Sequence, residues 1–137
     1  MAEKDFTGAS FYEYLSEGKL MAGRCLECAT IYLPPRPLCP SCRTGKAMVW
    51  TELSGGGALA AFTVVTVAPS FMAELGYGRD KPYCVGIVRL DEGPMISARI
   101  VGVDPARPDS IQVGAPVRLH ILPAEEIHRP VLAFELA

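Results

Sequence analysis

The sequence of 137 residues carries little net charge, with 13 Lys and Arg against 15 Asp and Glu and a formal charge of −2. Proteins that bind nucleic acid without sequence preference show a basic footprint, so this balance argues mildly against that class. No apolar run reaches the roughly 18 residues that a membrane span needs. The first ten residues, MAEKDFTGAS, hold no apolar signal-peptide core. These absences predict a cytoplasmic protein, whose cysteines stay reduced and available to a metal.

Signatures of catalysis are also scarce. The sequence has two histidines and contains no phosphate-binding loop, no G-x-S-x-G and no dinucleotide fingerprint. His120 falls on the predicted solvent face of a strand, and His128 lies in a polar segment near the C-terminus, so neither has a recognisable catalytic setting. Cys84 stands in an apolar strand, where a thiol behaves as a small hydrophobe. An independent enzyme that uses Cys84 or a histidine is therefore the least supported hypothesis.

Four of the five cysteines form two C-x-x-C pairs, Cys25/Cys28 and Cys39/Cys42, with ten residues between the pairs. Each pair folds into a tight turn that presents two thiolates, and two such knuckles supply the four tetrahedral sulfurs that structural zinc prefers. Iron is the lesser alternative, because rubredoxin-like sites share the spacing. A redox dithiol is disfavoured, since that interpretation requires a single pair in a βαβ setting.

The cysteine module has two further features. Zinc knuckles often carry glycine after the second cysteine to allow a left-handed turn, but Ala29 and Arg43 stand there, which predicts strained turns. The module is also rich in cations, with a single acid, Glu27. These cations either offset the −2 charge of a zinc ion bound by four thiolates or form a phosphate-binding patch. The interpretation as charge compensation is favoured. The cations are Lys19, Arg24, Arg36, Arg43 and Lys46.

The pattern predicts three regions: a helical lead-in over 1–18, a zinc ribbon over 19–46 and a β domain over 47–137. Phe11, Tyr14 and Leu15 share one face of a helix that Ser10 would cap and Gly18 would end. A helix this short needs a partner surface, which is either its own β domain or another subunit.

The β domain is expected to hold five or six strands and no further helix, a size typical of a small oligonucleotide/oligosaccharide-binding (OB) barrel. A triple glycine at 55–57 marks a turn or bulge after the first strand. The fold class is therefore mainly β, with a short N-terminal helix and a rubredoxin-like ribbon before the barrel. The expected strands are residues 47–54, the well-buried 58–68, the hairpin 83–90 and 95–101, residues 116–122 and residues 131–136.

The segment 69–82 is a predicted loop of fourteen residues, a length that often marks function. Apolar groups stand beside cations in it, a mixture that suits a ligand with an apolar chain and phosphates. The alternative is a lid whose aromatic side chains pack inward. Local chemistry, rather than a motif, nominates the candidate ligand-binding residues Arg36, Lys46, Phe71, Tyr77, Arg79 and Lys81.

With the helix, the zinc ribbon and the β domain assigned, the chain resembles a known family over nearly its whole length. The resemblance rests on FYEYLSEGKL, C-L-E-C, P-P-R-P-L-C-P-S-C, the D-E-G turn and I-Q-V-G-A-P-V. The family joins a rubredoxin-like zinc ribbon to an OB fold and is catalogued as domain of unknown function thirty-five.

The resemblance implies a non-catalytic accessory subunit of a hetero-oligomer, with a thiolase-superfamily enzyme as its partner and coenzyme A or acyl-CoA as its ligand. Relatives occur beside archaeal thiolase and hydroxymethylglutaryl-CoA synthase, beside steroid side-chain aldolases and hydratases, and in thiolases of aromatic degradation. The competing hypothesis is a single-stranded nucleic-acid-binding module, in which Trp50, Phe62 and Tyr83 would stack on bases.

Overall fold

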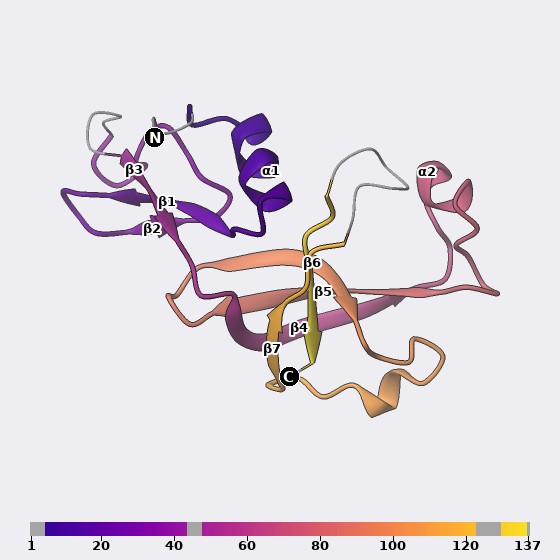
Figure 1. The fold of residues 1–137 in the computed structure, drawn as a ribbon. Helices are drawn as coiled ribbons and strands as arrows, with labels where there is room; N and C mark the ends of the chain where they lie inside the picture. The colour runs from indigo at the N-terminus through magenta and orange to yellow at the C-terminus, as the bar shows by residue number, and fades with distance from the viewer. Residues whose placement is uncertain (1–4, 44–47, 123–129, 137) are drawn as a thin grey trace.

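The chain, described by a computed structural model, folds into a small sheet with a helix beside it and a closed barrel (Figure 1). The structure describes residues 5–43, 48–122 and 130–136. The mainly β fold predicted from the sequence is confirmed. None of the helices in these ranges has the length and apolar character that crossing a membrane requires.

Helix α1 spans Gly8–Ser16 and begins one turn earlier than the sequence suggested. Its N-cap is Thr7, whose hydroxyl oxygen accepts a hydrogen bond from the Ser10 amide at 3.1 Å, so the prediction of Ser10 as the cap was wrong. The predicted stop is confirmed, because Gly18 adopts φ +83°. The amides of Gly18 and Lys19 then satisfy the last carbonyl groups of the helix in a Schellman motif.

The first sheet contains β1 (Met21–Cys25), β2 (Ile31–Tyr32) and β3 (Met48–Glu52), in the order β2-β1-β3. The sequence pattern predicts residues 47–54 as the first strand of the β domain, and that prediction is wrong for β3. β3 instead pairs antiparallel with β1, from Met21↔Glu52 to Cys25↔Met48. The reason is Trp50, whose ring stacks on Phe6 at 4.4 Å and meets the ring of Tyr14 edge-on at 5.0 Å.

The barrel closes in the order β4-β5-β6-β8-β7, with five strands, as expected of an OB fold. The hairpin of β5 and β6 matches the prediction, and β8 runs parallel to β6. The expectation of no further helix in the β domain was wrong, because a short helix, α2, lies in the predicted loop 69–82. A 3₁₀ turn also precedes β7 at Pro108–Ser110. The barrel elements are β4 (Gly56–Val65), α2 (Ser70–Ala73), β5 (Tyr83–Leu90), β6 (Met95–Val101), β7 (Pro116–Leu119) and β8 (Ala133–Leu136).

Strand β4 is less buried than its apolar sequence predicted. Leu59 is its one fully buried side chain, and Ala61 and Thr63 face solvent. A bulge between Leu59 and Ala61 shifts the register against β5. Gly57 allows close strand contact, because a Cβ atom there would clash with the carbonyl oxygen of Arg89.

One hydrophobic core joins the helix, the first sheet and the barrel. Leu15 of α1, Leu20 before β1, and Leu59 and Phe134 of the barrel are at most 1% exposed and belong to a single cluster. Helix α1 therefore packs within its own chain, which decides between the two partner surfaces left open by the sequence. A second, smaller cluster surrounds the cysteine knuckles.

Candidate functional site

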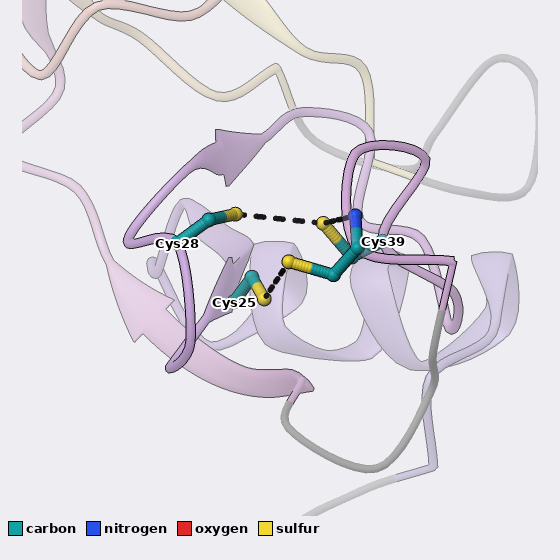
Figure 2. A group of neighbouring side chains, drawn as sticks. Cys25, Cys28 and Cys39 are labelled. Atoms are coloured by element: carbon teal, nitrogen blue, oxygen red, sulfur yellow. Dashed lines mark hydrogen bonds between the residues drawn. The ribbon is translucent and has the colours of Figure 1, made fainter.

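The four cysteines of the two C-x-x-C pairs converge at the end of the first sheet. Their Sγ atoms all lie within 4.8 Å of one another. Cys25 and Cys42 are separated by 3.8 Å between sulfurs, and Cys28 and Cys39 by 3.6 Å. In Figure 2 the labelled side chains of Cys25, Cys28 and Cys39 point toward one another. A zinc ion with four sulfurs at about 2.3 Å requires sulfur–sulfur edges of about 3.8 Å, so the geometry fits one structural zinc ion.

Two left-handed residues shape the knuckles. Ala29 has φ +61° and Arg43 has φ +57°, the conformation for which glycine is usual. The amide of Ala29 donates to the Cys25 carbonyl at 2.7 Å, and the amide of Arg43 donates to the Cys39 carbonyl at 2.6 Å. These equivalent hydrogen bonds close both turns. The strain expected from the sequence is therefore present, at a cost of about 1–2 kcal/mol per residue.

The surroundings of the sulfurs favour metal-binding thiolates at two positions. The Tyr32 hydroxyl, 3.4 Å from Sγ of Cys39, and the Cys42 amide lower the pKa of Cys39 to about 6. The Thr30 hydroxyl, 3.2 Å from Sγ of Cys28, lowers the pKa of that thiol. Hydrogen bonding to the sulfurs of Cys28 and Cys25 raises the pKa of Cys42 to about 12. A divalent cation would displace that proton, because only the thiolate is a strong ligand.

Four protein ligands leave a tetrahedral metal no open position, so the centre would stabilise the fold rather than activate a substrate. The nearby cations suit this role. The Arg36 guanidinium lies 5.9 Å from the ring centroid of Tyr32, the residue whose hydroxyl contacts Cys39. Arg36 thus belongs to the surroundings of the metal centre. The other ribbon candidate, Lys46, lies outside the described residues.

The remaining ligand candidates lie around α2 and the start of β5. Tyr77 is half-buried, and the Lys81 ammonium lies 4.3 Å from its ring centroid. The Arg79 side chain is exposed, and Phe71 on α2 is 61% exposed. The structure therefore brings Tyr77 and Lys81 together.

Arg99 on β6, which is not among the residues predicted from the sequence, joins this group. Its Nη2 donates to the Tyr77 hydroxyl at 3.2 Å, and its guanidinium lies 5.0 Å from the Tyr77 ring and 5.4 Å from the Tyr83 ring. The available signal was alternation: Ala98 and Ile100 are apolar and buried, which places Arg99 on the outer face of the barrel.

A groove of about 850 Å³ lies beside Arg99, between α1 and β6. Its walls come from α1, from the proline-containing loop after β2, from α2, β5 and β6, and from residues 130–132. Phe11, Leu33, Phe71 and Val85 contribute apolar surface. The groove therefore joins segments far apart in the sequence, including one of the predicted ligand residues, Phe71.

The residues considered for catalysis are unsuited to it where the structure describes them. Cys84 is 1% exposed, and burial raises the pKa of its thiol, which disfavours the nucleophilic thiolate. His120 is exposed, with Nδ1 3.9 Å from the Glu135 carboxylate. His128 lies outside the described residues.

The aromatic residues considered for base stacking are largely covered. Trp50 and Tyr83 are each 8% exposed, and Phe62 is half-buried. A stacking platform requires an open ring face. The nucleic-acid hypothesis therefore loses two of its three stacking candidates.

Two family profiles match consecutive parts of the chain. The profile described as "ChsH2, rubredoxin-like zinc ribbon domain" matches residues 13–48, and "ChsH2, C-terminal OB-fold domain" matches residues 50–122. A chain of a solved structure, the "Ltp2-ChsH2(DUF35) aldolase", is 27% identical, with a TM-score of 0.78 over 99% of this chain and 98% of that chain. A DUF35-family protein of unknown function from Sulfolobus solfataricus, 17% identical with a TM-score of 0.62, shares the fold.

Curated relatives agree with these matches. A "DUF35 domain-containing scaffold protein" of Methanocaldococcus jannaschii is 34% identical over 98 residues, 72% of this chain and 64% of that protein. A "Probable enoyl-CoA hydratase alpha subunit" of Thermomonospora curvata is 32% identical over 126 residues, 90% of this chain. The match spans only 36% of that longer protein. The chain belongs to the DUF35 family, which joins a ChsH2-type rubredoxin-like zinc ribbon to an OB-fold domain.

Proposed function

We propose that this protein is a non-catalytic accessory subunit that binds a thiolase-superfamily partner and helps to bind acyl-CoA. The reaction would form or cleave a carbon–carbon bond in a thiolase, hydroxymethylglutaryl-CoA synthase or aldolase complex. The observation that carries the proposal is the match over 99% of the chain to a chain of the Ltp2-ChsH2(DUF35) aldolase. The scaffold names of the archaeal relatives support the accessory role.

The chemistry of the described residues also supports a non-catalytic role for this chain. The cysteine centre suits one structural zinc ion, and the one buried thiol outside it, Cys84, is disfavoured as a nucleophile. The hydratase subunit name of the Thermomonospora relative supports an acyl-CoA setting. The domain boundary at residue 18 and the cytoplasmic location, where the thiols would stay reduced, remain part of the proposal. The boundary at residue 46 does not, because β3 pairs with β1 of the ribbon.

Native mass spectrometry of the protein purified gently from its own host tests this function. We expect a complex with a catalytic subunit of thiolase-superfamily sequence and one zinc ion per small chain. The same complex should bind an acyl-CoA more tightly than the separated catalytic subunit does. A zinc-loaded chain that stays alone, or a partner of unrelated sequence, would overturn the proposal.

A further inference from the structure

We propose that the groove between α1 and β6 binds the apolar body of an amphipathic anion, and that the Arg99 guanidinium holds the charged group of that ligand. The inference deepens the proposed function, because it assigns recognition of the acyl part of a substrate to this chain. It rests on the proposed function only for the identity of the natural ligand.

Arg99 is held firmly by its aromatic neighbours. The rings of Tyr77 and Tyr83 meet edge-on at 5.2 Å, and the guanidinium lies within 5.4 Å of both ring centroids. Its Nη2 donates to the Tyr77 hydroxyl. Contacts of this kind fix the planar guanidinium before a ligand arrives, which reduces the entropy lost on binding.

Among the described residues, Arg99 has no acidic partner. Across the described ranges no carboxylate forms an ion pair with it, and the Tyr77 hydroxyl does not offset a full positive charge. Its Nε is buried without a hydrogen-bond partner. A buried donor left unpaired costs about 1–3 kcal/mol, and such groups call for an explanation, for example an absent ion. An anionic ligand beside the guanidinium would supply the missing counter-charge.

The groove beside Arg99 suits the rest of such a ligand. Its volume of about 850 Å³ falls within the range of about 300–1,000 Å³ typical of small-molecule sites. Among the described residues that line it, Arg99 is the one charged side chain, and Phe11, Leu33 and Val85 offer apolar surface. In register on the barrel, Val85 stands directly opposite Arg99. A single cation at an apolar wall matches a ligand with one anionic group and a hydrocarbon body.

Lys81 adds positive charge near the same place. Its ammonium lies 4.3 Å from the Tyr77 ring centroid, and the side chain is exposed. Cations around one tyrosine raise the local positive potential and attract anions.

Calorimetric titration of the zinc-loaded full chain tests the groove without any partner. The probes are decanoate, decyl phosphate and decyltrimethylammonium, each below its micelle-forming concentration. We expect at least one anion to bind about tenfold more tightly than the cation of equal chain length. The tighter anion identifies the head group as carboxylate or phosphate. Competition by decanoyl-CoA then distinguishes a thioester ligand from a free acid.

Three variants locate the binding. Arg99→Gln should weaken anion binding by about tenfold, since a charge-assisted hydrogen bond is lost. It should not weaken binding of the cation, because the repulsion between the guanidinium and the cation's head group is lost as well. Arg89→Gln is the matched control, because Arg89 is an exposed arginine on the neighbouring strand β5. Ser97→Phe, at an exposed residue that lines the groove, should block every probe. Zinc content and thermal unfolding check that each variant is folded.

Equal affinities for anions and cation, or unchanged anion binding in Arg99→Gln, would overturn the proposal. So would the absence of binding by every probe. If Arg99→Gln then weakened the association with the catalytic subunit, the groove would be a protein interface instead. Failure of the proposed function would appear differently, as a missing partner in native mass spectrometry while the isolated chain still bound the anions.

Discussion

Replacing one zinc-site cysteine should remove the metal and unfold the ribbon, whereas the same replacement in the barrel should not. Cys39 is 0% exposed and Cys84 is 1% exposed. Cys39→Ala and Cys84→Ala therefore delete the same sulfur atom from two fully buried positions. Differences between the variants report the role of the sulfur rather than the size of the cavity.

The magnitudes follow from what surrounds each sulfur. Among the described residues, the ribbon cluster has three buried members, Cys25, Cys39 and Met48, and burial of one apolar side chain contributes only about 1.5–3 kcal/mol. Structural zinc contributes on the order of 10–16 kcal/mol to a small zinc domain. The free energy lost with one zinc ligand should therefore exceed the free energy that packing of this cluster contributes. Cys84→Ala should cost about 1 kcal/mol, as for other small deletions in a core.

The assay combines metal analysis with hydrogen exchange read by mass spectrometry. In Cys39→Ala we expect loss of stoichiometric zinc and of amide protection in β1, with protection kept in β5. Cys84→Ala should keep both zinc and protection. The reasoning is refuted if Cys39→Ala retains one zinc ion per chain, or if both variants lose protection in β1 equally.

Three further predictions concern the same module. Ala29→Gly should raise the unfolding temperature slightly, because relief of the left-handed strain, about 1–2 kcal/mol, exceeds the backbone entropy cost of glycine, about 0.5–1 kcal/mol. Gly18→Ala, at a residue with φ +83°, is the opposite control and should lower the unfolding temperature. Tyr32→Phe should weaken zinc binding by about tenfold in a chelator competition, since it removes the hydroxyl beside the Cys39 sulfur; unchanged affinity would contradict that role. Zinc affinity should rise by at least about tenfold per pH unit above pH 7, because Cys42, with its pKa raised to about 12, must release its proton to bind; a flat profile between pH 7 and 9 would argue against this.

The parts of the fold that depend on residues close together in the sequence could be predicted from the sequence. The hairpin of Tyr83–Leu90 and Met95–Val101 was predicted with its true bounds, because two alternating runs flank one turn. The stop signal at Gly18, just after α1, was predicted for a similar reason, since glycine readily adopts positive φ. The cap was misassigned because Thr7 and Ser10 both carry hydroxyls, and only the backbone shows which one accepts.

The sequence by itself determined the four-cysteine set, because a C-x-x-C pair closes within one turn and needs no distant contact. Tertiary structure decided where Met48–Glu52 pairs, since alternation shows that a strand has a buried face but not which sheet receives it. It also decided that Arg99 meets Tyr77, twenty-two positions away, at a groove walled by α1 and β6. Those contacts arise only when the barrel closes and the shared core brings the helix against it.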